Sequence, residues 1–277
     1  MPQAPGDIGT FRQLVLDHYA LHARDLPWRH THDAYAILVS EIMLQQTQVV
    51  RVVPKYQSFL AAFPTLSALA GAPTSEVLSA WQGLGYNRRA LALQRSSAII
   101  ETDFGGVIPC SVAELRKLPG IGDATAAAVC VYAYDQPLPF IETNIRSAFI
   151  HFFFQECTSV SDAELLPLVE LALDTQNPRD WYYALMDYGA WIKSAGPNPG
   201  RRSRHHARQS RFAGSRREAR GAILRTLLEA GPQGITLDML TDGPPSRNRE
   251  ESELKSILDE LAEEGFLRHE GSNYRVA

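Results

Sequence analysis

Apolar residues recur at helical spacing almost without interruption through the first 195 residues of this 277-residue chain. Pro- or Gly-containing breaks such as Phe63-Pro64 and Pro119-Gly120 separate the segments. We expect helices over Ala34–Val53, Thr74–Leu84, Ala90–Thr102, Ser111–Leu118, Asp123–Tyr134, 162–174 and 179–194. Because strand patterns appear only near the C-terminus, this region must bury its core by packing helix on helix. The sequence therefore predicts an all-α fold for residues 1–195.

The last sixty residues follow a different pattern. We expect helices over 216–229, 237–240 and 249–264, and then two strands over 266–269 and 274–276. This order resembles a small winged helix. The third helix carries seven acids against Arg249 and Lys255, and DNA phosphates would repel these acids in a groove. We therefore expect residues 216–277 to form a winged-helix-like domain that packs or contacts protein.

Composition indicates a soluble globular protein. The chain is 45% hydrophobic and 21% charged, and it contains no uninterrupted apolar run of membrane-spanning length. Its N-terminus lacks the basic start and apolar middle of a secretory signal. Three scattered cysteines, Cys110, Cys130 and Cys157, form neither a disulfide framework nor a metal-ligand spacing. We expect a cytoplasmic protein without a bound metal.

Positive charge is concentrated in one short segment. Eight of the 27 basic residues are arginines between Arg201 and Arg220, where Glu218 is the only acid, although the net charge of the whole chain is −4. Such a segment over residues 196–215 is either a solvated linker or a phosphate-binding segment, because clustered cations gain most from the release of counterions. In the second case the arginines that would contact DNA are Arg201, Arg202, Arg204, Arg208 and Arg211.

A glycine-containing turn, Leu118-Pro119-Gly120-Ile121-Gly122, lies between two helical segments. Two glycines allow positive φ, and the amides at the start of the next helix, which contains Thr125, suit a phosphate. As a bare pattern it is a common helix connector. The run Leu-Pro-Gly-Ile-Gly-Asp-Ala-Thr-Ala is, however, similar to the hairpin of helix-hairpin-helix DNA glycosylases.

Other motifs follow in the order that this family has. They are Leu26-Pro27-Trp28-Arg29, Ser40-Glu41-Ile42-Met43-Leu44-Gln45-Gln46-Thr47-Gln48-Val49, Trp81-Gln82-Gly83-Leu84-Gly85-Tyr86 and Ala184-Leu185-Met186-Asp187-Tyr188-Gly189-Ala190. Over about residues 15–195 the chain resembles the adenine DNA glycosylases, which excise adenine mispaired with guanine or 8-oxoguanine. The resemblance implies a six-helix lobe over about 30–138, a second helical lobe from 1–29 plus 139–195, and an active site in the cleft between them.

Glu41 interrupts an otherwise apolar helix. Its helical face carries Ile37, Leu38 and Leu44, so the acid should be partly desolvated, which favours its protonated form. On these grounds alone it is either a structural acid paired to an unseen base or a general acid. The resemblance implies that Glu41 protonates the adenine ring.

A second carboxylate departs from the family pattern. Where relatives have an aspartate in a run like Leu-Asp-Gly-Asn-Val, this chain has Ile141-Glu142-Thr143-Asn144-Ile145. Glutamate keeps the charge that stabilises an oxocarbenium ion, and its longer arm shifts that charge; a misplacement of about 1 Å costs on the order of 100-fold in rate. We expect Glu142, with Asn144, to be the sugar-stabilising group; otherwise Glu142 is a surface acid.

The same resemblance assigns DNA contacts. Tyr86 resembles a tyrosine that wedges into the base stack, and Gln45 and Gln46 resemble amides that probe the opposite strand. It implies a base pocket lined by Trp28, Arg29, Leu44 and Asp187. A packing role is the alternative for Trp28 and Leu44, and an exposed turn for Tyr86. The hairpin would bind DNA phosphates through Gly120, Ile121, Gly122 and Thr125.

Three family features are missing. Ala124 stands where lyase members carry a lysine, so no Schiff base forms there. No cysteine follows Cys157, so we expect no iron–sulfur cluster and no other cofactor. We also expect no counterpart of the larger domain with which the family reads 8-oxoguanine.

We therefore expect a monofunctional, monomeric glycosylase acting on duplex DNA in the cytoplasm, at the nucleoid, that removes mispaired adenine. Two alternatives stay open. One is the same fold acting on thymine or uracil opposite guanine, or on hypoxanthine. The other is a non-catalytic protein that binds damaged DNA.

Overall fold

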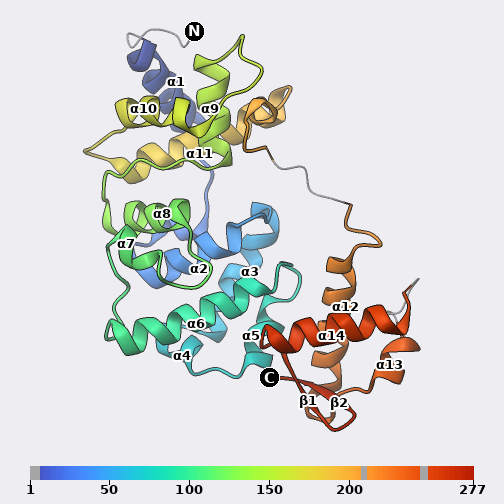
Figure 1. The fold of residues 1–277 in the computed structure, drawn as a ribbon. Coiled ribbons are helices and arrows are strands. Elements are labelled where there is room, and N and C mark those ends of the chain that lie inside the picture. The colour runs from blue at the N-terminus through green and yellow to red at the C-terminus, as the bar shows by residue number, and fades with distance from the viewer. Residues whose placement is uncertain (1–6, 207–210, 244–248) are drawn as a thin grey trace. The chain divides into compact units, whose positions relative to one another are not determined.

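The computed structural model describes residues 7–206, 211–243 and 249–277 (Figure 1). It is helical up to a C-terminal hairpin, which confirms the predicted all-α class with a small two-stranded addition. The α-helices are α1 Asp7–His22, α2 Ala34–Leu44, α3 Val49–Ala62, α4 Leu66–Ala70, α5 Thr74–Trp81, α6 Arg88–Asp103, α7 Val112–Leu115, α8 Asp123–Tyr134, α9 Thr143–Phe153, α10 Asp162–Ala172, α11 Pro178–Ala195, α12 Arg216–Ala230, α13 Leu237–Thr241 and α14 Glu251–Glu263. Short 3₁₀ turns are η1 Pro27–His30, η2 Pro199–Arg202 and η3 Gly231–Gln233, and the strands are β1 Leu267–Glu270 and β2 Asn273–Val276.

The chain divides into two compact units. Unit 1 contains residues 1–41, 108–117 and 121–208, and unit 2 contains residues 42–107, 118–120 and 209–277. The predicted lobes, over 30–138 and over 1–29 plus 139–195, have different boundaries and stay a prediction. No helix in the described part of the chain is both long and apolar enough to cross a membrane.

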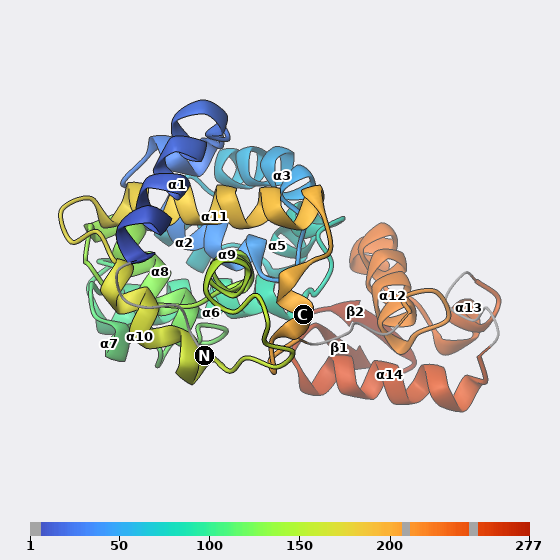
Figure 2. The same cartoon turned by 90° about the horizontal axis from the view of Figure 1, so that it is seen from above.

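Unit 1 is built around the packing of α9 on α11. Figure 2 shows α9 end-on beside α11. Aromatic side chains fill this core: the ring of Phe11 on α1 lies 4.7 Å from that of Phe149 and 6.2 Å from that of Trp181. Gly189 sets the closeness of the two helices, because a Cβ at this position would lie 2.1 Å from the carbonyl oxygen of Asn144.

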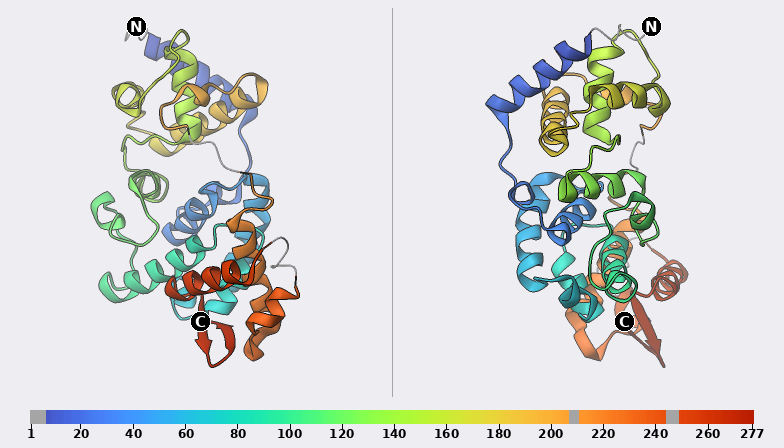
Figure 3. Two further views of the ribbon diagram at one scale, coloured as in Figure 1. Left: turned by 45° about the vertical axis from the view of Figure 1, so that its right-hand side comes forward. Right: turned by 90° about the vertical axis from the view of Figure 1, so that its left-hand side faces the viewer.

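Unit 2 contains α3–α6 and the C-terminal helices with their hairpin. Figure 3 shows α12, α13 and α14 gathered beside the β1–β2 hairpin. The strands pair antiparallel, with Leu267 opposite Val276. Four apolar residues recur at helical spacing on α14 and are all buried: Leu254, Ile257, Leu258 and Leu261.

The acids of α14 bind arginines of the same unit. Glu260 pairs with Arg216 at 2.7 Å, and Glu264, at the end of the helix, accepts from Arg220 at 2.6 Å and from Arg88 of α6 at 2.5 Å. These contacts fit the expected packing role of the acidic helix better than a place in a DNA groove, where phosphates would repel the same carboxylates.

The predicted continuous helix over Ala34–Val53 is wrong. It is interrupted between Leu44 and Val49, and Gln46 within the break has φ +55°. The reason is a buried arginine, Arg89, which donates to the carbonyl oxygens of Ile42, Met43 and Gln45. A continuous helix would direct these oxygens to amides one turn further along.

Candidate active site

Glu41 lies in the last turn of α2. The residue is half-buried, and in the described part of the chain its carboxyl has no hydrogen-bond or ion-pair partner. The side chains that precede and follow it, including Ile37, Leu38 and Ile42, are almost fully buried. Burial, with a smaller contribution from the charge of Glu142, raises the pKa of Glu41 to about 8. Glu41 is therefore a carboxylic acid that keeps its proton at neutral pH.

Glu142 is the N-cap residue of α9. Its Oε1 accepts from the amides of Asn144 at 2.5 Å and Ile145 at 2.9 Å, and its Oε2 lies 3.4 Å from Nδ2 of Asn144. Burial raises the pKa of Glu142, whereas these amides and the charges of Lys193 and Arg146 oppose the rise. The carboxylate thus folds back onto its own helix, where the amide donors favour its ionised form.

Tyr132 of α8 interacts electrostatically with both carboxyls. The interaction with Glu41 and the weaker one with Glu142 add to burial in raising the pKa of Tyr132. Its ring stacks on that of Tyr183 at 4.6 Å. Its hydroxyl is buried and has no hydrogen-bond partner among the described residues. The sequence analysis did not select Tyr132. The one feature that could have indicated it was its hydroxyl group within the apolar run of α8.

Asp187 of α11 binds two arginines. Its carboxylate oxygens accept from Arg29 at 2.6 and 2.8 Å, and from the side chain and amide of Arg24 at 2.6 and 2.9 Å. Although burial opposes it, these donors hold the pKa of Asp187 below its ordinary value. Arg24 was not predicted, because nothing in its sequence neighbourhood marks it.

Arg29, predicted to line a base pocket, packs against an aromatic ring. Its guanidinium lies 4.5 Å above the ring of Tyr183, and its Nε is buried without a partner among the described residues. An unpaired buried donor is costly, so this Nε is a position where a ligand acceptor would be favoured. Trp28 is buried on η1, and Leu44 is half-buried at the end of α2 in unit 2.

The predicted DNA-probing residues lie in two turns of unit 2. Gln45 and Gln46 form the turn between α2 and α3, and Nε2 of Gln45 donates to the carbonyl of Gly120 at 3.2 Å. Tyr86 ends the Gly83–Tyr86 turn with φ +49° and an exposed fraction of 37%. Arg217 donates to the Tyr86 hydroxyl at 3.0 Å.

The hairpin has the backbone that its glycines allow. Gly120 has φ +77°, and a Cβ there would lie 2.8 Å from that of Ala92. Ile121 is buried, and Gly122 begins α8 without a side-chain cap, in the turn where Thr125 lies half-buried. Asp123 pairs with Arg116 at 2.7 Å.

The arginine segment contains two kinds of residue. Arg201, Arg204 and Arg211 are exposed. Arg202 instead donates to carbonyls near the end of α9, namely those of Ile150, Phe154, Gln155 and Cys157. Its guanidinium caps the end of α9. The prediction that Arg202 contacts a DNA phosphate is therefore withdrawn. Arg208 lies outside the described residues.

The cysteines do not fit an iron–sulfur cluster. Cys110 is exposed, Cys130 is buried in α8, Cys157 is half-buried, and the residues that follow α11 contain no thiol. In residues 7–206, 211–243 and 249–277 no three histidine, cysteine or acidic side chains converge as metal ligands.

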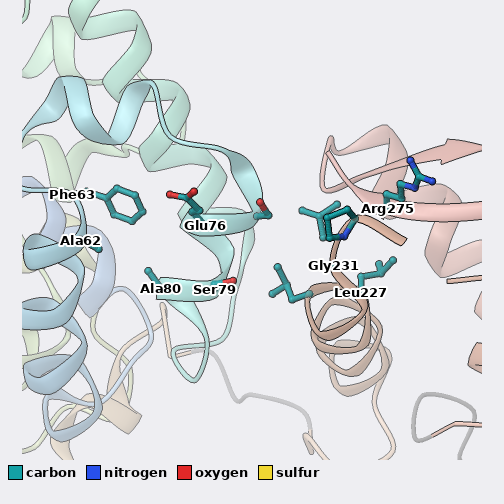
Figure 4. A pocket seen from close by; sticks show the side chains of 12 residues that line it. Ala62, Phe63, Glu76, Ser79, Ala80, Leu227, Gly231 and Arg275 are labelled. Carbon is teal, nitrogen blue, oxygen red and sulfur yellow. The ribbon is translucent and has the colours of Figure 1, made fainter. Parts of the chain in front are cut away.

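A recess elsewhere in unit 2 is lined by Phe63, Glu76, Ser79, Leu227 and Arg275, among others (Figure 4). Its wall holds one carboxylate and one cation, and none of the predicted site residues lines it. We assign it no part in catalysis.

The chain is similar to known repair proteins in sequence. Residues 39–165 match the model of the HhH-GPD superfamily base excision DNA repair protein. An adenine DNA glycosylase of Mycolicibacterium smegmatis is 37% identical over 238 residues, which cover 78% of this chain and 80% of the relative. One from Buchnera aphidicola (subspecies Baizongia pistaciae) is 34% identical over 66% of this chain, and there the chain spans about half of the relative, 53%.

Solved structures share the fold. A thermostable thymine-DNA glycosylase matches with a TM-score of 0.59 and 26% identity, over 67% of this chain and 87% of that protein. An endonuclease III trapped as a covalent intermediate with DNA matches with the same TM-score and 17% identity, over 68% of this chain and 87% of that one. The second likeness concerns the fold alone.

Proposed function

This chain belongs to the HhH-GPD superfamily of base excision DNA repair proteins and is a DNA N-glycosylase, and we propose that the base it removes is adenine opposite guanine or 8-oxoguanine in duplex DNA. The observation that carries the proposal is Glu41, a carboxyl among apolar side chains that keeps its proton up to a pH of about 8. Adenine is a poor leaving group until a ring nitrogen is protonated, and a neutral acid near physiological pH supplies that proton.

The proposed reaction divides the work between the two acids. Glu41 donates its proton to the flipped adenine, and the bond between C1′ and the base breaks with its electron pair going to the base. The ionised Glu142 stabilises the resulting sugar cation. Water then adds to C1′, and the proton it loses returns to a carboxylate of the pair. Two carboxyls whose environments push their ionisation apart suit these two roles.

Arg29 and Asp187 would orient the flipped base. Asp187 holds the two ends of the Arg29 guanidinium, which leaves the buried Nε of Arg29 as a donor. An adenine ring nitrogen is a matching acceptor for this donor, which otherwise stays unpaired. Trp28, buried on η1, would supply an apolar side of the pocket.

Single-turnover cleavage of duplexes containing A:8-oxoguanine, A:G, T:G, U:G or hypoxanthine tests the substrate. We expect the two adenine mispairs to be cleaved and Glu41→Gln to abolish cleavage. The outcome that contradicts the proposal is cleavage of T:G or U:G with the adenine duplexes intact. Excision of thymine or uracil opposite guanine is the second candidate function, and the 26% identity to a thymine-DNA glycosylase favours it. Tight binding without any cleavage would instead indicate a damage-binding protein.

We further propose that the enzyme is monofunctional, because Ala124 provides no amine where a lyase needs one. Incubation with cleavable duplex and borohydride should trap no covalent protein–DNA product, whereas a lyase would be trapped through its Schiff base. A borohydride-dependent adduct would overturn the proposal.

We also propose that the enzyme works without an iron–sulfur cluster, since the segment after α11 carries arginines and no cysteine. The purified active protein should contain no stoichiometric iron or acid-labile sulfide. Iron at four atoms per chain, lost together with activity, would contradict this.

A further inference from the structure

Arg89, in the first turn of α6, is a buried arginine whose positive charge is not balanced by an acid. Its exposed fraction is 8%, and in the described part of the chain no carboxylate pairs with it. Burial lowers its pKa to about 10, so the guanidinium stays charged at neutral pH. A buried charge is costly unless its donors are satisfied. The hydrogen-bond partners of Arg89 therefore show which segments this buried guanidinium holds together.

Those partners belong to two turns and the helix end before them. Nη1 donates to the carbonyls of Ile42 and Met43, each at 2.9 Å, and to that of Gln45. Nη2 donates to Oγ1 of Thr47 at 2.9 Å and to the carbonyl of Gly85 at 3.1 Å. One guanidinium therefore joins the end of α2 and the Gln45–Thr47 turn to the Gly83–Tyr86 turn.

The group also lies beneath the proposed wedge. The guanidinium carbon of Arg89 is 5.4 Å from the ring centre of Tyr86 and 5.5 Å from that of Trp81. The link continues to the hairpin, because the side chain of Gln45, whose carbonyl binds Arg89, donates to the carbonyl of Gly120. Three segments expected to contact DNA thus meet in one hydrogen-bonded network.

Neither turn holds its own shape through regular secondary structure. Gln46 and Tyr86 both have positive φ, at +55° and +49°, a region that residues with a Cβ rarely adopt. Such conformations persist only where surrounding contacts fix them. The carbonyls that Arg89 binds directly precede both residues, those of Gln45 and Gly85.

We propose that Arg89 is a positioning residue that fixes the wedge turn, the opposite-strand turn and the catalytic helix end as one rigid DNA-reading surface. Glu41 belongs to that helix end, because it lies in the last turn of α2 with Ile42 and Met43. The inference rests on the proposed roles of Tyr86, Gln45 and Gln46. It assigns to Arg89 the recognition of a mispair rather than affinity for DNA in general.

Arginine is required here because its planar fork places donors on two sides at once. Lysine keeps the charge but has a single ammonium, which cannot reach the carbonyls on both sides in the same geometry. Arg89→Lys is therefore the informative change. A matched control is Ile100→Ala on the same helix, which destabilises a fully buried site without removing any of these hydrogen bonds.

Two quantities are measured at a temperature where all proteins are folded by circular dichroism. The first is the ratio of the dissociation constants for matched and A:8-oxoguanine duplexes. The second is the cleavage rate at saturating enzyme. We expect Arg89→Lys to bind matched DNA like the parent, to lose most of its preference for the mispair, and to cleave on the order of 100-fold more slowly. Ile100→Ala should change neither quantity.

Equal mispair preference and equal rate in Arg89→Lys and Ile100→Ala would overturn the inference. If Arg89→Lys does not fold, Thr47→Val removes one acceptor of the network and Thr47→Ser keeps it. We then expect only the valine variant to lose mispair preference, and equal behaviour of the two would overturn the inference. The two proposals also fail separately. A parent that cleaves no adenine duplex contradicts the proposed function, and Arg89 is then tested by the ratio for matched DNA and the mispaired duplex that the parent does bind preferentially.

Discussion

Glu41 is a neutral carboxylic acid among apolar neighbours. This environment explains the chemistry proposed for it and also why its ionisation should destabilise the folded protein. The same desolvation that keeps the proton on Glu41 opposes ionisation as the pH rises. Activity and stability should therefore respond to one titration in linked ways.

The rate of base excision should depend on pH through both acids. With the pKa of Glu41 at about 8, kcat/KM should fall about tenfold per pH unit above that value as the acid form is lost. The pKa of Glu142 is also raised. As the pH is lowered, the rate should therefore begin to fall at a higher pH than protonation of an ordinary glutamate would produce. Single-turnover rates across the pH range measure both limbs. A rate that stays constant well above pH 8 would exclude Glu41 as the proton donor.

Glu41→Gln should make the protein more stable at alkaline pH while it abolishes cleavage. Between the unfolded pKa of 4.5 and the folded pKa of about 8, the folded protein holds a proton that the unfolded chain releases. The free energy of unfolding of the parent therefore falls as pH rises through this window, whereas glutamine has no proton to release. Thermal melts at pH 5 and pH 8.5 should show a stability gain only at the higher pH. Equal gains at both would point to packing instead.

Tyr132→Phe should slow cleavage about tenfold without destabilising the protein. The hydroxyl is buried and unpartnered among the described residues, so its removal costs no internal hydrogen bond. About 1.4 kcal/mol of lost interaction in the transition state corresponds to that tenfold change. The cleavage rate at saturating enzyme and the melting temperature are measured for the parent and for Tyr132→Phe. Tyr134→Phe, on the same helix, is the control. An unchanged rate for Tyr132→Phe would make the hydroxyl a packing feature only.

The sequence could predict the role of a residue that lies in a motif. It could not predict the role of a residue whose partners come from distant parts of the chain. Glu41 was expected to be desolvated from its apolar neighbours alone, and its pKa confirms that. The role of Glu142 as an N-cap depends on where α9 begins, which its sequence of aromatic and β-branched residues does not mark. Arg24 and Arg202 find their partners 163 and 48 residues away, respectively, and no local pattern announces either contact.

At the scale of the element, α2 shows how tertiary contacts override local preference. Every residue from Ala34 to Val53 is compatible with a helix, and the break arises because Arg89, more than forty residues later, takes the carbonyls of the helix end. The opposite holds for α14, whose buried face follows from spacing alone. Periodicity thus predicts where helices run better than where they stop.

Gly189→Ala should destabilise unit 1 strongly, by about 2 kcal/mol or more. The added methyl would fall 2.1 Å from the carbonyl oxygen of Asn144, so α9 and α11 must separate. Glu142 and Asn144 lie at the start of α9, and cleavage should therefore decline as well at temperatures where the variant is folded. Gly196→Ala, with open space around it, is the control. Equal melting temperatures for the two variants would contradict the close packing.

At the scale of the whole molecule, the charge that remains for DNA is smaller than the arginine count indicates. Arg216 and Arg220 are paired with acids of α14, and Arg202 caps α9. In the described part of residues 196–215, Arg201, Arg204 and Arg211 are exposed, and Arg204 lies 4.0 Å from Glu164. Sequence could locate this segment but could not separate its internal partners from its exposed charges.

Replacing Arg201, Arg204 and Arg211 together with glutamate should weaken binding to every duplex equally. Each lost phosphate contact reduces the slope of log affinity against log salt by about one. Binding measured at several salt concentrations, on matched and mispaired duplexes, gives the slope. Arg225→Glu, an exposed charge reversal on α12, serves as the control. An unchanged slope would make the segment a linker.

The four donors around Asp187 have a thermodynamic consequence. Arg24 and Arg29 are already immobilised before any DNA arrives, so their conformational entropy is lost once, when the chain folds, and not at each encounter with a base. A flipped nucleotide would meet arginines whose side chains are already ordered.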